Sequence, residues 1–101
     1  MSSKARVTIE VDATNDGVPC SVELFLNAEA IRHLILELGS LSESKDHFHW
    51  FAPEWGPPQG ELSLIPYHKE RVTAGQLKVT FRPDHWDRQY FPHVFGNAAQ
   101  D

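Results

Sequence analysis

Cysteine, clustered positive charge and long apolar runs are all scarce in this chain of 101 residues. The one cysteine, Cys20, has no partner for an internal disulfide, so we expect stability to come from packing, as in a reducing cytoplasm. The longest apolar runs are three residues, whereas a membrane-spanning helix needs about 20 and a signal peptide roughly 7–15. These shortages predict a cytoplasmic protein that has no membrane partner.

Basic side chains are few and scattered along the chain. Nine Lys and Arg residues stand against fourteen Asp and Glu residues, which gives a net charge of −5. Binding to a phosphate backbone needs clustered Lys and Arg, so we expect no nucleic-acid partner. An acidic surface favours solubility and, more specifically, attraction to a basic protein.

Motifs that would identify an enzyme are missing as well. The chain has no Gly-rich phosphate loop, no Gly-x-Ser-x-Gly serine and no paired zinc-ligand motif. Cys20 alternates with apolar residues, which is typical of a buried thiol rather than a nucleophile. Glu10, Glu23 and Glu61 could approach one another as an acid and base group, although a solvated sheet face is the commoner arrangement. We therefore predict that the protein is not an enzyme.

What the chain does contain is a clear alternation of strands around one helix. Polar and apolar residues alternate with period two in residues 6–11, 20–26 and 76–82, and shorter strands are predicted at 47–51 and 61–65. A turn at 14–17 joins the first two strands into a hairpin. Residues 28–38 are predicted to form a helix, with Asn27 as its N-cap and Gly39 as its C-cap. The apolar stripe of this helix comprises Ile31, Leu34, Ile35 and Leu38.

The order ββαβββ predicts an α+β fold, a two-layer sandwich of a mostly antiparallel five-stranded sheet and one amphipathic helix. The helix would cover the face that carries Val22, Leu24 and Leu26, and the face with Thr8 and Glu10 would stay open. The length fits a single domain over residues 1–101. We expect the aromatic-rich C-terminal segment, 83–101, to be irregular.

Two histidines in the predicted third strand invite a metal-binding hypothesis. His47 and His49 occupy alternate positions and so point to one side of a strand, where two imidazoles could bind Zn or Ni. A complete site needs a third ligand, and the spacing does not choose among the candidates His68, His85, His93, Glu61 and Asp84. The alternative is that both rings simply decorate a polar strand face.

Aromatic residues concentrate in a proline-rich loop and in the C-terminal segment. Trp55 precedes Gly56-Pro57-Pro58, and four more aromatic residues follow Pro83. Trp and Tyr are enriched at the hot spots of protein interfaces, and large exposed aromatic patches are unusual. Either these side chains complete a small core, or they dock a partner together with nearby carboxylates. For the second case the predicted partner-binding residues are Glu54, Trp55, Trp86, Asp87 and Tyr90.

Several short stretches resemble the small immunity proteins of bacterial polymorphic toxin systems. They are Leu34–Leu38, His47-Phe48-His49-Trp50, Trp55-Gly56, Glu61-Leu62 and the strand around Leu77–Phe81, and the similarity covers roughly residues 24–82. The resemblance implies a bacterial, cytoplasmic, non-enzymatic protein that binds a cognate toxin domain and blocks it. Such families share no catalytic residues, so none is carried over.

The leading hypothesis is therefore a protein-binding module of the immunity-protein type, a toxin inhibitor that needs no cofactor and acts by occluding a basic toxin domain. The first alternative is a small metal-binding protein or metal-dependent enzyme built on His47 and His49. The second is a homo-oligomeric structural subunit whose aromatic tail forms a homodimer.

Overall fold

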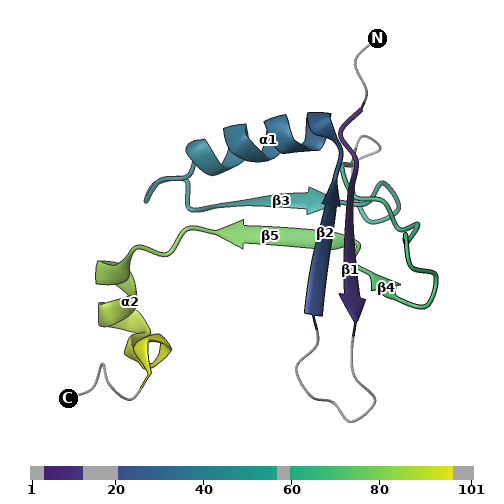
Figure 1. Ribbon diagram of the computed structural model, residues 1–101. Coiled ribbons are helices and arrows are strands. Elements are labelled where there is room, and N and C mark those ends of the chain that lie inside the picture. The colour runs from purple at the N-terminus through teal and green to yellow at the C-terminus, as the bar shows by residue number, and fades with distance from the viewer. Residues whose placement is uncertain (1–3, 13–20, 57–59, 97–101) are drawn as a thin grey trace.

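The computed structural model describes residues 4–12, 21–56 and 60–96, which form two small antiparallel sheets and two α-helices (Figure 1). The elements in chain order are β1 (Val7–Asp12), β2 (Ser21–Leu26), α1 (Ala28–Gly39), β3 (His47–Phe51), β4 (Val72–Thr73), β5 (Gln76–Thr80), α2 (Asp84–Tyr90) and the 3₁₀ turn η1 (Pro92–Phe95). In this part of the chain no helix has the length and apolar character needed to cross a membrane.

The first sheet has the order β2-β1-β4. β1 and β2 pair over six residue pairs, from Val7 opposite Leu26 to Asp12 opposite Ser21. β4 is short and pairs with the other edge of β1, where Val72 lies opposite Val11. β1 is therefore the central strand, and β2 is an outer strand.

The second sheet consists of β3 and β5, and in Figure 1 these strands cross the direction of β1 and β2. Phe48 lies opposite Val79 and Trp50 opposite Leu77, so all four side chains share one face. Phe48 and Trp50 are almost fully buried in a core where the two sheets and α1 meet. The buried apolar residues of this core are Val7, Ile9, Ala30, Phe48, Trp50, Ala52 and Leu62.

α1 begins where the sequence predicts. The Asn27 side chain accepts a hydrogen bond from the Ala30 N–H at 2.9 Å, which satisfies one of the unpaired donors of the first turn. Gly39 is the last helical residue, and Ser40 rather than Gly39 is the C-cap. Only Ala30 of the helix is buried, with Leu34 packed against the core.

The predicted sandwich of a five-stranded sheet and one helix is wrong. Residues 61–65 form no strand, because the backbone of residues 61–63 hydrogen-bonds to β1 of the first sheet and to β3 of the second. The Val7 N–H donates to the Glu61 carbonyl at 2.9 Å, and the Leu62 N–H donates to the Phe51 carbonyl at 3.1 Å. Leu62 makes a single parallel bridge to Val7. This segment joins β1 to β3 instead of adding a strand to one continuous sheet.

The predicted faces of the first sheet are also wrong. Thr8 and Glu10, expected on an open face, are 1% and 0% exposed, since the segment after Leu62 covers them. On the opposite face, Val22 and Leu24 were expected to be covered, yet they are 59% and 42% exposed. Cys20, expected to be buried beside them, lies outside the described residues.

The C-terminal segment contains regular structure where an irregular tail was expected. Pro83 precedes α2 with extended backbone, and acidic residues in the first turn with Arg88 in the last turn suit the helix dipole. Trp86 and Tyr90 are four residues apart, and their ring centroids lie 4.8 Å from each other. This i, i+4 aromatic pair is a helical signal. In Figure 1, α2 lies at the end of β5 that is remote from β1.

Candidate protein-binding site

The strongest candidate site is a group of aromatic rings packed around one arginine at α2. We call Arg82, Trp86, Tyr90 and Phe91 the α2 cluster. The guanidinium carbon of Arg82 lies 4.4 Å from the centre of the Trp86 ring and 5.2 Å from that of Phe91. Trp86 and Phe91 are 5.3 Å apart between centroids. Cation–π contacts of this kind orient the rings as one unit, while Tyr90 stays 56% exposed.

Carboxylates surround this cluster. Asp87 lies 3.8 Å from the Nε of Arg82, and Glu43 lies 2.9 Å from the Nε2 of His85. Asp46 accepts a hydrogen bond from the Nδ1 of His47 at 2.7 Å, and this bond is the main reason that the pKa of Asp46 lies below its usual value. Near neutral pH the Asp46 carboxylate is therefore ionised.

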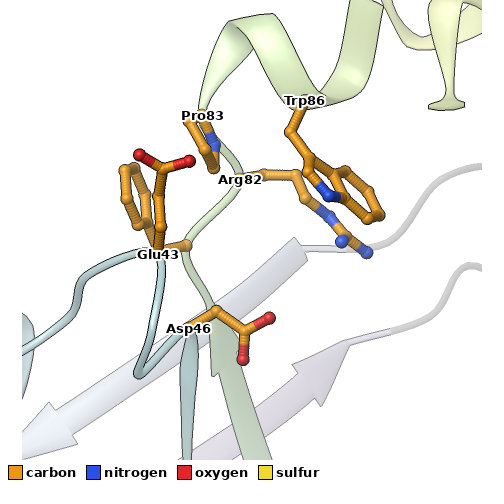
Figure 2. A pocket seen from close by; sticks show the side chains of 6 residues that line it. Glu43, Asp46, Arg82, Pro83 and Trp86 are labelled. Carbon is orange, nitrogen blue, oxygen red and sulfur yellow. The ribbon is translucent and has the colours of Figure 1, made fainter. Parts of the chain in front are cut away.

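A hollow lies between the cluster and the loop that precedes β3. Figure 2 shows Arg82 extending beside the Trp86 indole, with Glu43 on the other side of the backbone at Pro83 and Asp46 below it. Its volume is about 70 Å³, whereas small-molecule sites are roughly 300–1,000 Å³. Two further hollows beside Ser63 and Ile65 measure about 220 and 280 Å³. These volumes suit surface contact with a macromolecule better than enclosure of a substrate.

The predicted partner-binding residues do not form one surface. Trp86, Asp87 and Tyr90 lie together on α2, after β5 has ended. Glu54 and Trp55 follow β3, at the opposite end of the β3–β5 pair. The Trp55 indole lies over Gly75, where an added Cβ would be 2.9 Å from its Nε1, and it is 69% exposed. The structure thus separates two aromatic groups that were predicted as one site.

The two predicted metal ligands, His47 and His49, lie next to each other. The rings of His47 and His49 pack edge to face, 5.1 Å between centroids, and His49 also stacks on Phe51. Within residues 4–12, 21–56 and 60–96, no group of three or more His, Cys, Asp or Glu side chains could hold a metal ion. Binding of Zn or Ni at this pair stays an untested hypothesis.

The predicted carboxylate group is divided by the fold. Glu10 and Glu23 lie opposite each other on β1 and β2, and Arg71 contacts both, at 3.3 and 2.9 Å. None of the hydrogen bonds described connects the Glu61 side chain to Glu10 or Glu23. Its backbone carbonyl accepts a hydrogen bond from the Val7 N–H. The fully buried Glu10 also accepts hydrogen bonds from the Tyr67 and His68 backbone N–H groups and, at 2.9 Å, from the His68 Nδ1.

These contacts set the charge of Glu10. Burial raises the pKa of this carboxyl, but the hydrogen bonds from the His68 side chain and from the Tyr67 and His68 backbone outweigh burial and lower the pKa overall. In turn, the hydrogen bond to Glu23 raises the pKa of Arg71. Glu10 is therefore a buried anion that holds the segment over β1, and it does not face a substrate-sized hollow.

Sequence reasoning missed Arg82, Phe91 and Glu43 as parts of the α2 site. The i, i+4 spacing of Trp86 and Tyr90 was the available signal for a helical aromatic pair, whereas Arg82 and Phe91 flank the helix and carry no such signal. Glu43 comes from a separate loop, and nothing in its sequence context marks it. In comparisons with protein-family models, curated proteins and solved structures, no match was found.

Proposed function

We propose that this chain is a non-enzymatic protein-binding module whose α2 cluster and carboxylate rim contact a basic protein. The observation that carries the proposal is the combination of aromatic rings packed against one another, an exposed Tyr90 and a group of carboxylates at one end of the molecule. Aromatic side chains supply most of the affinity at interface hot spots, and complementary charge speeds association and selects the partner.

The balance of charge at this end favours a basic partner. Four carboxylates lie on α2 or line the hollow, on Glu43, Asp46, Asp84 and Asp87. Against them stand Arg82, which is already engaged by Trp86 and Asp87, and Arg88, which lies over the Phe95 ring. A cationic partner surface would therefore meet net negative potential around an apolar centre.

The resemblance to immunity proteins supplies the class of partner for this proposal. A bacterial toxin domain bound at α2 would be blocked by occlusion, which requires no cofactor and no catalytic residue in this chain. A cytoplasmic location belongs to the same proposal and rests on the single cysteine.

The two tyrosines of the chain provide a matched test, because Tyr67 and Tyr90 are each 56% exposed. Tagged wild-type protein is used to capture its partner from the source lysate with and without a chelator, and the affinity of the purified pair is then measured. Tyr90→Ala should weaken binding about 30-fold, a hot-spot effect on the order of 2 kcal/mol. Tyr67→Ala should leave the affinity unchanged, and the chelator should have no effect.

Several outcomes would contradict the proposal: no protein captured, equal loss in both variants, or capture that a chelator abolishes. The last result would favour the metal hypothesis at His47 and His49. Trp55→Ala is the third variant, predicted to be a hot spot from sequence. Because Trp55 lies at the far end of the β3–β5 pair, its effect reports whether the partner reaches both ends.

A further inference from the structure

The α2 cluster already holds a cation of its own. The guanidinium carbon of Arg82 lies 4.4 Å from the centre of the Trp86 ring and 5.2 Å from the centre of the Phe91 ring. The Nε of the same side chain is 3.8 Å from the Asp87 carboxylate. Aromatic faces and a carboxylate are also the groups that bind an arginine side chain at protein interfaces. We call Trp86, Phe91 and Asp87 the arginine seat.

The arginine seat is held together by contacts that do not involve Arg82. The rings of Trp86 and Phe91 are 5.3 Å apart between centroids, and Trp86 also packs against Tyr90 at 4.8 Å. Asp87 belongs to the first turn of α2, and its side chain is only 13% exposed. The seat should therefore keep its shape when Arg82 leaves it.

Arg82 itself is only loosely bound in the seat. It precedes the N-cap Pro83 and so lies outside α2, and its side chain is 44% exposed. The 3.8 Å between its Nε and Asp87 is longer than a hydrogen bond. An ion pair of this length beside water contributes little to stability, so the Arg82 side chain can rotate out at small cost.

A second acidic position is open to Arg82 after such a rotation. Glu43 and Asp46 line the same hollow as Arg82 (Figure 2). The pKa of Asp46, lowered chiefly by its hydrogen bond with His47, is lowered further by the charge of Arg82. A rotation of Arg82 over this hollow would therefore keep its charge beside a carboxylate.

We propose that the arginine seat binds an arginine side chain of the basic partner, and that Arg82 fills the seat until the partner's arginine displaces it. This inference rests on the proposed function and specifies the chemical group that the partner presents. One guanidinium replaces another, so the rings and Asp87 make the same kinds of contact before and after the exchange. The exposed Tyr90 and the surrounding carboxylates supply the additional contacts that favour the partner.

An internal competitor weakens the binding of every ligand that needs the same seat. The apparent dissociation constant is the intrinsic one divided by the fraction of molecules whose seat is vacant, so Arg82 present about nine-tenths of the time costs the ligand roughly tenfold. Removal of Arg82 should therefore strengthen the binding of an arginine ligand. If Arg82 served only to position the rings, its removal would weaken binding, so the two roles predict opposite signs.

Arg82 and Arg88 provide a matched pair of variants, because each lies over an aromatic ring and each loses one positive charge on mutation to Ala. The probes are capped oligoarginine and oligolysine peptides of equal length, titrated by calorimetry at about 150 mM salt to screen distant charges. Arg82→Ala should bind oligoarginine at least about fivefold more tightly than Arg88→Ala does, with a smaller gain for oligolysine because an ammonium stacks less well on aromatic rings.

The folding of both variants is checked by circular dichroism. Equal affinities of Arg82→Ala and Arg88→Ala for oligoarginine, weaker binding by Arg82→Ala, or an equal gain with oligolysine would each overturn the proposal.

Displacement can also be followed in the wild-type chain, without any mutation. Because the Arg82 guanidinium lies over the Trp86 ring, the ring current shifts the NMR signal of its Nε–H proton. Saturating oligoarginine should move this signal to the position of a solvent-exposed arginine and leave the Arg88 signal in place. An Arg82 signal that does not move at saturation would overturn the proposal.

The captured partner separates failure of this inference from failure of the proposed function. If Tyr90→Ala and Arg82→Ala both weaken binding of the partner, the proposed function stands and the exchange at the arginine seat is wrong. Tighter binding by Arg82→Ala together with weaker binding by Tyr90→Ala is the result expected here.

Discussion

β1 and β2 are hydrogen-bonded neighbours with similar alternating sequences and opposite environments. The first four residues of β1, Val7 to Glu10, are at most 4% exposed, whereas the first four of β2 are all exposed. The difference arises from segments distant in sequence, since residues 61–71 and β4 bond to the β1 backbone and to the Glu10 side chain. They reach β2 only through the side-chain contacts of Arg71 with Glu23 and of Tyr67 with Phe25. Alternation therefore identifies a strand, and the rest of the chain decides which of its faces are buried.

The difference in burial between β1 and β2 is tested most sensitively at the Ile9–Leu24 pair. These residues lie directly opposite each other, but Ile9 is 4% exposed and Leu24 is 42% exposed. Ile9→Ala should lower the free energy of unfolding by about 2–5 kcal/mol because it leaves a cavity. Leu24→Ala should cost about 1 kcal/mol, because this side chain is already partly in water.

Urea denaturation of both variants at low micromolar concentration makes this measurement. Equal losses would mean that β2 is as well covered as β1.

The Glu10–Glu23 pair tests the same difference between β1 and β2 with a buried and an exposed carboxylate. Glu10→Gln removes the anion that binds two backbone N–H groups, His68 and Arg71, so its melting temperature should fall by on the order of 10 °C at neutral pH. Glu23→Gln alters a contact whose carboxylate is 51% exposed, and the change should be small.

Acid should remove the difference between wild type and Glu10→Gln. The pKa of Glu10 is lowered from its ordinary value of 4.5, so its ionised form contributes stability that is complete above about pH 4.5 and is lost as pH falls through the lower folded value. Melting curves from neutral pH downward should therefore converge below pH 4.5. A constant gap between the two proteins at all pH values would contradict the role assigned to this carboxylate.

Local signals predicted the local structure of this chain well. The Asn27 cap and the apolar period of residues 28–38 correspond to α1, and the alternating stretches correspond to β1, β2, β3 and β5. What could not be predicted depends on distant partners. Leu62 and Leu64 alternate as in a strand, but the backbone at 61–63 bonds to both β1 and β3. Nothing near Glu10 in the sequence indicates that His68 and Arg71 will cover it.

In the candidate site, too, local features could be predicted from the sequence and features that depend on distant segments could not. The enrichment of Trp and Tyr at interfaces was enough to group Trp86 with Tyr90, and their rings do lie together, 4.8 Å between centroids. The chain between Trp55 and Trp86 gives no indication of their separation, because it depends on the path of β5 away from β1. The addition of Glu43 to the α2 rim likewise depends on the loop that precedes β3.

Backbone hydrogen exchange tests the contrast between β1 and β2 most directly. The amides of β1 should exchange slowly, and the alternate amides of β2 that point away from β1 should exchange quickly. Equal protection of both strands would contradict the account.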